Sequence, residues 1–409
     1  MRQLDATGIN VVHDADLDNT DTVVLNTCGF IHDAKQESID TILNYIQAKE
    51  DGLINELFVM GCLSERFKDE LAREIPEVDK YFGVTDIQEI TESLKVDFKK
   101  ELLGERMITT PSHFAYLKIA EGCDRTCSFC AIPAIRGPHK SRTVESLVEE
   151  AQFLADKGVK ELILIAQDLT YYGLDLYKSQ ELPRLVRELC SVKGIEWIRL
   201  HYAYPAKFPM ELLQVMREEP KVCNYIDIPF QHINDQVLDK MRRVISTEQT
   251  KQLIEQLRLQ VPELAIRTTM LVGHPGEDDQ AFEELKAFVK EARFDRLGVF
   301  TYSEEEGTWG AENLKDDIDE KLKQARADEL MLLQQEISAS LNLSKIGRQF
   351  KVVIDRSEDD YYVGRTEYDS PEVDTEVLIK KAENVLQIGN FYNILIDSAD
   401  DFDLFGKVI

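Results

Sequence analysis

The chain has 409 residues, 43% hydrophobic and 30% charged, which places it in the globular class and allows two or three domains. No apolar run reaches the roughly 18 residues that a membrane-crossing helix needs, and the start shows no signal-peptide pattern, so we expect a cytoplasmic protein. The seven cysteines are odd in number and three are clustered, which favours thiols or metal ligands over a disulfide framework.

The charge is strongly unbalanced, with 48 Lys and Arg against 76 Asp and Glu and a formal net charge of −28. Proteins bind nucleic acids largely by neutralising phosphates with Lys and Arg, so this balance argues against direct nucleic-acid recognition. A basic partner would instead be attracted at long range. An acidic proteome or a need for solubility explains the charge equally well, so the charge alone does not decide the function.

Residues 1–104 are predicted to form an N-terminal α/β domain. Two strand-like runs, "TVVLNTC" and "ELFVMGC", end at Cys28 and Cys62, and an amphipathic stretch with helical spacing lies between them. This pattern predicts a β-α-β unit with both cysteines at the carboxyl ends of neighbouring parallel strands, the edge where open α/β sheets bind ligands. The opening residues look like the end of a helix followed by a strand, so we expect this domain to lack its first strand.

A linker is predicted near residues 104–113, and residues 113–303 then repeat a strand-then-helix pattern six times. The strand candidates are "AYLKIAEG", "ELILIAQD", "WIRLHYAYP", "YIDIPFQH", "AIRTTMLVGHPG" and "RLGVFTYS". Helices are expected between them, for example at 143–157 and 277–292. Six such units predict a parallel sheet curled into a partial barrel, with functional groups at the carboxyl ends of its strands.

The last part of the chain divides into a helical connector, 304–344, and a segment with period-two patterning, 345–409. Short strands separated by Gly, Asp and Pro turns predict a small OB-like β-barrel. Such barrels often bind RNA through a basic face, but this segment has 8 basic against 14 acidic residues, a net charge of −6. Its aromatic residues are therefore expected to pack within the sheet rather than stack on bases: Tyr361, Tyr362, Phe391 and Tyr392.

The stretch "EGCDRTCSFC" carries Cys123, Cys127 and Cys130 in the loop after the first strand of the predicted barrel. Three thiolates leave one iron of a four-iron four-sulfur cubane without a protein ligand, and an open metal position can hold a small chelating molecule. The spacing is that of radical S-adenosylmethionine enzymes, in which this molecule is S-adenosylmethionine. The alternative is a structural zinc site formed by the three cysteines and His139.

Over nearly its whole length the chain resembles the methylthiotransferases of the radical S-adenosylmethionine superfamily. The matching motifs are "NTCGFIHDAKQESID", "MGCLSERF", "EGCDRTCSFCAIPAIRGPHKSR", "IAQDLTYYG", "DIPFQHINDQVLDKMRR" and "VGHPGE", and the final barrel resembles the family's TRAM domain. "NTCGFI" followed by "AKQESID" is most similar to the branch that modifies an aspartate of small-subunit ribosomal protein twelve. The sister branch modifies an adenosine in tRNA. Because ribosomal proteins are basic, the acidic composition favours the protein substrate.

The resemblance implies two 4Fe-4S clusters and S-adenosylmethionine. Cys123, Cys127 and Cys130 would hold the cluster that generates the radical, and Cys28 and Cys62 would hold an auxiliary cluster that supplies or carries the sulfur. The family uses a third auxiliary cysteine in an N-terminal strand that is missing here, so one ligand is expected to be absent. The radical would remove hydrogen from the aspartate β-carbon, which then takes up the methylthio group, so no catalytic side chains beyond the cluster ligands are expected.

Several further residues follow predicted strands. Contacts to S-adenosylmethionine are assigned to Gln167, Asp168, Arg199, Gly273 and Gly276, although structural pairing or turn formation explains each equally well. Asp227, Gln231 and His232 either line the site or have structural roles. The lone thiols Cys190 and Cys223 are expected in the core. The acidic runs "SEEEGTWGAE" and "SADDFDLF" are expected on solvated faces, with docking of a basic substrate as the alternative.

We therefore expect a monomeric enzyme whose partners are the ribosomal protein, free or in the ribosome, and an electron donor, with no membrane. Two alternatives remain open from the sequence. One is a tRNA adenosine methylthiotransferase, which would require a basic face. The other is a non-enzymatic metal-binding scaffold with an OB-like module.

Overall fold

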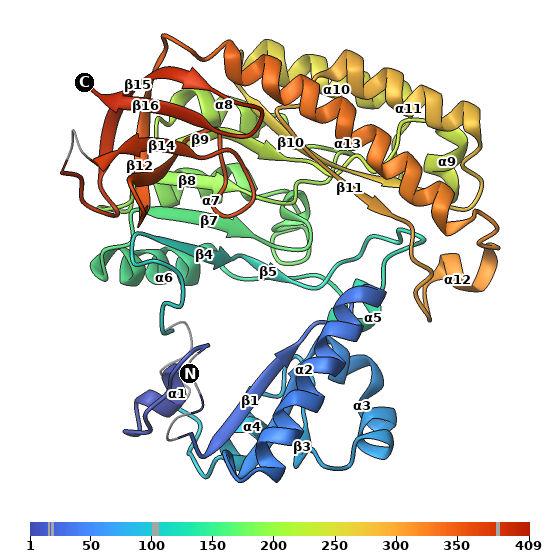
Figure 1. The fold of residues 1–409 in the computed structure, drawn as a ribbon, viewed down its shortest axis with the longest axis vertical. Helices are drawn as coiled ribbons and strands as arrows, with labels where there is room; N and C mark the ends of the chain where they lie inside the picture. Colours follow the sequence, from blue (N-terminus) through green and yellow to red (C-terminus); the bar gives the residue numbers. More distant parts are fainter. Residues whose placement is uncertain (15–16, 18–19, 100–105, 382–384) are drawn as a thin grey trace. The chain divides into compact units, whose positions relative to one another are not determined.

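The computed structural model describes residues 1–14, 17, 20–99, 106–381 and 385–409. It divides into two compact units, each described by itself (Figure 1). The first contains Met1–Thr109, Gly122–Pro138 and Ser303–Asn313, and the second contains Thr110–Glu121, His139–Tyr302 and Leu314–Ile409. Residues 104 and 105 of the predicted linker lie outside the described residues, and the predicted domain boundaries stay predictions. In the described part of the chain, no helix has both the length and the apolar character needed to cross a bilayer.

The first unit is built on a three-stranded parallel sheet with the order β1-β2-β3. Its elements are α1 (Arg2–Asp5), β1 (Thr22–Thr27), α2 (His32–Glu50), β2 (Glu56–Gly61), α3 (Cys62–Glu74), β3 (Lys80–Tyr81), α4 (Ile87–Ser93), α5 (Ile132–Arg136) and α12 (Trp309–Asn313). β1 and β2 pair in register from Thr22 opposite Glu56 to Thr27 opposite Gly61. The predicted β-α-β unit is therefore confirmed.

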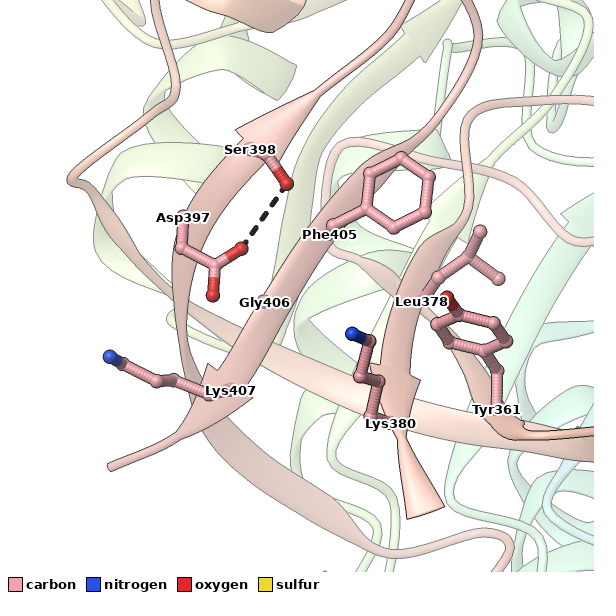
Figure 2. Close-up of a pocket in the computed structure, with 8 residues that line it drawn as sticks. All are labelled: Tyr361, Leu378, Lys380, Asp397, Ser398, Phe405, Gly406 and Lys407. Atoms are coloured by element: carbon pink, nitrogen blue, oxygen red, sulfur yellow. Dashed lines mark hydrogen bonds between the residues drawn. The ribbon is translucent and has the colours of Figure 1, made fainter. Parts of the chain in front are cut away.

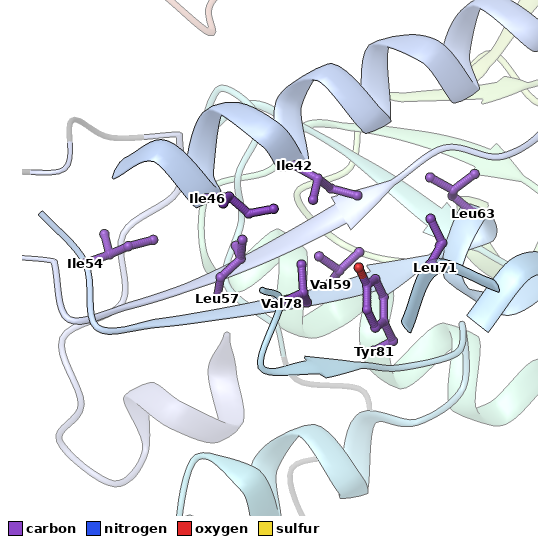
Figure 3. Packing of buried hydrophobic residues seen from close by; sticks show 9 residues of the cluster. All are labelled: Ile42, Ile46, Ile54, Leu57, Val59, Leu63, Leu71, Val78 and Tyr81. Atoms are coloured by element: carbon purple, nitrogen blue, oxygen red, sulfur yellow. The ribbon is translucent and has the colours of Figure 1, made fainter. Parts of the chain in front are cut away.

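The core of this unit lies between the sheet and its helices (Figure 3). Ile42 and Ile46, one helical turn apart on α2, pack in one cluster with Leu57 and Val59, which share a face of β2 because side chains alternate along a strand. The other members of the cluster are Ile54, Leu63, Leu71, Val78 and Tyr81. This packing holds the carboxyl ends of β1 and β2 in place, and each cysteine follows one of those ends.

The second unit contains a six-stranded parallel sheet with the order β4-β7-β8-β9-β10-β11. Its elements up to residue 301 are β4 (Phe114–Lys118), β5 (Ala120–Glu121), β6 (Lys140–Ser141), α6 (Val144–Asp156), β7 (Glu161–Ile165), η2 (Leu169–Tyr171), α7 (Leu182–Cys190), β8 (Trp197–Leu200), α8 (Glu211–Glu218), β9 (Val222–Asp227), α9 (Asp235–Lys240), α10 (Thr247–Gln260), β10 (Ala265–Val272), α11 (Asp279–Ala292) and β11 (Arg296–Thr301). Because the strands follow one another in chain order and are joined by helices, the sheet is the predicted partial barrel.

The remainder of the second unit is a long helix followed by a closed barrel. Its elements are α13 (Glu320–Leu343), β12 (Gln349–Glu358), β13 (Tyr361–Thr366), β14 (Val377–Lys380), β15 (Phe391–Ala399) and β16 (Leu404–Val408), and the barrel order is β12-β13-β14-β16-β15. The predicted small barrel is confirmed. Phe391 packs edge-on against Trp197 of β8, with 4.8 Å between the ring centroids.

Figure 2 shows a pocket of about 330 Å³ on this closed barrel. The pocket is lined by both charged and aromatic side chains. The lining residues are Tyr361, Leu378, Lys380, Asp397, Ser398, Phe405, Gly406 and Lys407. The Tyr361 ring contacts Phe405 edge-on at 6.4 Å. Tyr361 of β13 thus packs against a residue of β16, across the intervening strand β14, and also borders a pocket.

The closed barrel covers the amino ends of the parallel strands within the second unit. Glu161, the first residue of β7, is fully buried, accepts a hydrogen bond from Arg199 of β8 and forms an ion pair with Arg365 of β13. Burial alone would raise the pKa of Glu161, but the two guanidinium groups outweigh it and lower the pKa to about 2. Since this joint occupies the amino ends, the carboxyl ends of the strands lie on the opposite edge of the sheet.

Candidate functional site

The three-cysteine loop runs from Gly122 to Pro138, between β5 and β6. These two short strands pair antiparallel, with Ala120 opposite Ser141. Gly122 has a φ of +80°, and a Cβ at this position would lie 2.2 Å from the carbonyl oxygen of Pro138. Only glycine allows the two ends of the loop to approach so closely.

Backbone hydrogen bonds organise the cysteines inside this loop. The N–H of Cys123 donates to the carbonyl of Gly137 at 3.1 Å, and the N–H of Cys130 donates to the carbonyl of Cys127 at 3.2 Å. The N–H of Arg125 donates to the Cys123 sulfur at 3.4 Å. Cys123 is buried, the other two cysteines are half-buried, and none of the chain's seven cysteines forms a disulfide.

Three thiolates in one short loop are a donor set that fits an iron–sulfur cluster with one open iron. A zinc ion needs its ligands within about 2.3 Å of one point, whereas the thiolates of a cubane cluster bind different irons. The predicted fourth zinc ligand, His139, instead lies with Nε2 3.2 Å from Ser141 Oγ and with its ring 4.9 Å from that of Tyr171. An N–H···S bond such as that to Cys123 is also the kind of contact that tunes cluster ligands.

Cys28 and Cys62 follow paired residues of two neighbouring parallel strands, as the sequence predicted. Thr27 at the end of β1 lies opposite Gly61 at the end of β2. Cys28 is exposed, and Ser38 of α2 holds its backbone through two hydrogen bonds of 3.0 Å, one to the N–H and one to the carbonyl. Cys62 is half-buried and begins α3.

Two glycines allow these strand ends to come together. Gly61 has a φ of +108°, and a Cβ there would lie 2.4 Å from the carbonyl oxygen of Thr27. A Cβ on Gly29 would lie 2.6 Å from the backbone of Leu63. The backbone after β1 is thus packed directly on the start of α3, which brings the segments that carry Cys28 and Cys62 together.

The three-cysteine loop and this cysteine pair belong to the same compact unit. α5, at the end of the loop, contacts α3. Arg136 of α5 donates from Nη2 to the sulfur of Cys62 at 3.1 Å. The sequence showed no sign of this contact, because the two residues are 74 positions apart.

The acidic segment Ser303–Asn313 also belongs to this unit, and the expectation of a solvated face is wrong at Glu305. Glu305 is 2% exposed and accepts from Lys35 at 2.8 Å and from Arg66 at 3.2 Å. Arg66 also donates to the carbonyl of Gly29 at 2.7 Å, next to Cys28. A run of three consecutive glutamates gives no pattern from which the buried one could be chosen.

The same segment reaches the three-cysteine loop. The N–H of Gly310 donates to the carbonyl of Ser128, between Cys127 and Cys130, at 2.7 Å. Ser128 is itself completely buried. One acidic segment therefore contacts both cysteine-bearing regions of the first unit.

The predicted S-adenosylmethionine contacts lie in the second unit. Gln167 Nε2 donates to Glu121 at 3.2 Å, and Asp168 is buried and caps η2 by accepting from the N–H and hydroxyl of Thr170. Arg199 has no exposed surface, and its guanidinium is bound to Glu161 and to the carbonyl of Glu367 at 2.7 Å. Arg199 thus takes the structural pairing that the sequence left open.

The loop after β10 contains the other two predicted contacts, Gly273 and Gly276. The N–H of Gly273 donates to Glu277 at 3.0 Å, and Glu277 also pairs with Arg326 of α13 at 2.8 Å. His232 is fully buried, with its ring 3.4 Å from the Glu277 carboxylate. Both glycines have positive φ values, +74° and +91°, so the turn itself requires them.

Other residues singled out in the sequence have different surroundings. Asp227 ends β9, and burial raises its pKa to about 6 although Arg267 partly opposes the shift. Gln231 has a φ of +72°. Cys190 and Cys223 are buried as expected, and burial raises the pKa of each thiol to about 12.

Family models match three parts of the chain. Residues 117–289 match the radical SAM superfamily, residues 346–409 match the TRAM domain, and residues 1–83 match the uncharacterized protein family UPF0004. The fold and the cysteine loop therefore define a radical S-adenosylmethionine enzyme. Membership of this superfamily implies an iron–sulfur cluster and S-adenosylmethionine as cofactors.

Curated relatives match the whole chain. The ribosomal protein uS12 methylthiotransferase RimO of Phocaeicola vulgatus is 57% identical over 409 residues, which cover 100% of this chain and 95% of the relative. Relatives of the same name from Christiangramia forsetii and Cytophaga hutchinsonii are 56% and 53% identical over 100% of this chain and over 90% and 93% of their own lengths. The chain belongs to the RimO family of radical S-adenosylmethionine methylthiotransferases.

Solved structures share the fold at low identity. The radical S-adenosylmethionine methyltransferase TsrM from Kitasatospora setae, solved with cobalamin and a [4Fe-4S] cluster, has a TM-score of 0.52 and 14% identity. The match covers 69% of this chain and 63% of TsrM. This likeness supports the fold alone.

Proposed function

We propose that the chain adds a methylthio group to the β-carbon of an aspartate in ribosomal protein uS12. The observation that carries this proposal is the identity of 53–57% over the whole chain to enzymes named for that substrate. The grouping of five cysteines in one compact unit supports it, because the reaction needs a radical source and a sulfur source.

Cys123, Cys127 and Cys130 are the proposed ligands of the radical-generating cluster. Such a cluster supplies an electron that cleaves S-adenosylmethionine bound at its open iron. Gly122 lets the loop close, and the N–H of Arg125 donates to the Cys123 sulfur, which favours the thiolate over the thiol. The half-buried positions of Cys127 and Cys130 shield the site from bulk water while leaving access for a small molecule.

Cys28 and Cys62 are the proposed ligands of a second, auxiliary 4Fe-4S cluster. Their adjacency at the ends of β1 and β2 and the close backbone packing that Gly29 and Gly61 allow there support this assignment. Two thiolates are fewer than a cubane normally receives, so a further ligand has to complete it.

The S-adenosylmethionine contacts proposed in the second unit are Gln167, Asp168, Gly273 and Gly276. Arg199 is not proposed as a contact, because it is fully buried and bound to Glu161 and to the carbonyl of Glu367. Gln167 is half-buried beside Glu121, which immediately precedes the cysteine loop. The loop of Gly273 and Gly276 follows β10 at a strand carboxyl end, where barrels of this kind bind ligands.

The proposed partners are uS12, free or in the ribosome, and an electron donor. The net charge of −28 supports attraction to a basic ribosomal protein and disfavours direct nucleic-acid readout. A protein substrate made in the cytoplasm supports a cytoplasmic location, and we propose that the enzyme acts as a monomer.

The test is an anaerobic assay with reductant, S-adenosylmethionine and uS12, comparing wild type with two cysteine variants. Cys127→Ala should abolish both cleavage of S-adenosylmethionine and the methylthio mass increase on uS12. Cys62→Ala should keep the cleavage and lose the mass increase. The matched control, Cys190→Ala, alters a core thiol and should keep both activities. Modification of tRNA instead of uS12, with tight and salt-sensitive tRNA binding, would contradict the proposed substrate.

A further inference from the structure

Arg136 connects the two cysteine groups of the first unit. It is the last residue of α5, in the same loop as Cys123, Cys127 and Cys130, and its Nη2 donates to the sulfur of Cys62 at 3.1 Å. A guanidinium is always charged and is weakly hydrated, so it suits a half-buried contact with a sulfur that carries negative charge. The segment that bears one set of predicted ligands therefore touches a ligand of the other set.

The position of Arg136 is set by its own loop. Gly137 ends α5 with a φ of +70°, and its N–H donates to the carbonyl of Pro133 at 3.1 Å. Its carbonyl in turn accepts from the N–H of Cys123. Because Ile135 on the same short helix is buried, α5 cannot rotate without losing packing. The guanidinium is thus tied to the backbone of the first cysteine of the loop.

α5 packs against α3, the helix that begins with Cys62. The contact between Arg136 and the Cys62 sulfur therefore lies where two packed helices of the first unit meet.

We propose that Arg136 is a positioning residue that donates a hydrogen bond to Cys62 as a ligand of the auxiliary cluster and raises the reduction potential of that cluster. The inference rests on the proposed function, because it requires a cluster at Cys28 and Cys62. A positive charge beside a ligand sulfur offsets the extra negative charge of the reduced cluster, so reduction becomes easier. The loop of the radical cluster thereby sets a property of the auxiliary one.

The first test uses the metal-free chain and does not depend on any cluster. Each thiol is allowed to react with a dianionic aromatic disulfide and, separately, with a neutral one of similar size. The rate with the dianionic reagent divided by the rate with the neutral reagent reports the charge near the thiol, because differences in the accessibility of the thiol affect both rates equally. The rates are followed at Cys62 and at Cys28 by peptide mass spectrometry. Arg136→Gln should lower the ratio at Cys62 by roughly three- to tenfold, the effect of removing one charge near 4 Å in water. The ratio at Cys28 should not change.

Two variants control this measurement. Arg136→Lys keeps the charge and should restore most of the ratio. Arg73→Gln makes the same chemical change at a 72% exposed position of α3 and should leave the ratio as in wild type. An unchanged ratio in Arg136→Gln, or an equal fall in Arg73→Gln, would overturn the proposal. Misfolding would change the rate ratio at both cysteines, so a change of the ratio at Cys28 in the same sample would reveal it.

The second test loads the auxiliary site alone, in a variant with Cys123, Cys127 and Cys130 changed to Ala. Addition of Arg136→Gln should make the midpoint potential of the remaining cluster more negative, and Arg136→Lys should reverse most of the shift. An identical potential in all three proteins would overturn the tuning role. The triple-alanine variant could retain no iron although Arg136→Gln lowers the rate ratio in the first test. That result would refute the proposed auxiliary cluster, and with it the tuning role of Arg136. The contact between Arg136 and Cys62 would still be supported.

Discussion

Glu161 and Arg365 form a buried ion pair of 2.5 Å that joins the first residue of β7 to the penultimate residue of β13, next to Thr366. Arg199 completes the cluster from the other side of the carboxylate. Two cations around one anion leave a net positive charge, which Asp355 balances by pairing with Arg365 at 2.8 Å. The closed barrel is therefore bound to the partial barrel by a charge cluster in which Glu161, Arg199 and Arg365 are buried and Asp355 is 14% exposed.

Glu161→Gln should lower the free energy of unfolding by about 3–5 kcal/mol, since it leaves two guanidinium groups buried without their partner. The measurement is equilibrium unfolding in guanidinium chloride. A matched control is Glu263→Gln, which breaks the exposed pair with Arg348 at the edge of the same joint and should cost about 1 kcal/mol or less. Equal effects of the two substitutions would show that the buried cluster contributes no more than a surface pair.

Asp227→Asn should change how stability depends on pH. Burial raises the pKa of Asp227 from 3.8 to about 6, so the folded chain holds a proton that the unfolded chain releases between these values. The contribution of Asp227 to the free energy of unfolding therefore falls as pH rises from about 4 to 6, and it does not fall further above 6. The variant should gain stability relative to wild type across that window and keep a constant advantage above it.

Thermal unfolding at pH 4 and pH 7.5 measures this difference. A variant that is less stable relative to wild type at pH 7.5 than at pH 4 would contradict the direction of the shift. That result would mean that the attraction of Arg267, 3.9 Å away, outweighs burial.

Glu305→Gln should loosen the segment Ser303–Asn313 from the rest of the first unit. The substitution leaves Arg66 and Lys35 without their carboxylate and should cost roughly 3 kcal/mol, the low end for buried pairs, because Lys35 is 20% exposed. Hydrogen exchange should become faster in this segment and at the Gly310 N–H. Glu304→Gln, at the exposed neighbouring position, is the control and should leave exchange unchanged.

Gly61→Ala should disturb the ends of β1 and β2 where Cys28 and Cys62 lie. The new Cβ would meet the Thr27 carbonyl at 2.4 Å and would also force alanine to a φ of +108°. We expect a loss of at least about 2–3 kcal/mol in unfolding free energy and a fall in the iron retained after reconstitution.

Gly52→Ala separates the two causes of that loss. Gly52 also has a positive φ, +74°, but no atom lies within 4 Å of the place that an alanine Cβ would take, so only backbone strain remains. It should cost about 1 kcal/mol and leave the iron content unchanged. Equal losses of iron in both variants would show that the close approach at Gly61 is not what shapes the cysteine pair.

Local sequence patterns determined the regular elements and their order. The alternation of apolar strands and amphipathic helices predicted all six strands of the parallel sheet, since each must bury its faces under a neighbouring helix. The runs ending at Cys28 and Cys62 likewise predicted adjacent parallel strands. Motif spacing indicated the three-cysteine loop, because spacing along a short loop is a local property.

Only the tertiary structure decided which charged groups are buried and which residues meet across the chain. Arg199 was assigned to a ligand by its place on a strand, yet it pairs with Glu161 because the closed barrel excludes water from that end of the sheet. Glu305 and its exposed neighbour Glu304 are chemically identical in the sequence, and packing against Lys35 and Arg66 separates them. The contact of Arg136 with Cys62 depends on how α5 packs on α3, a long-range arrangement that no local pattern encodes.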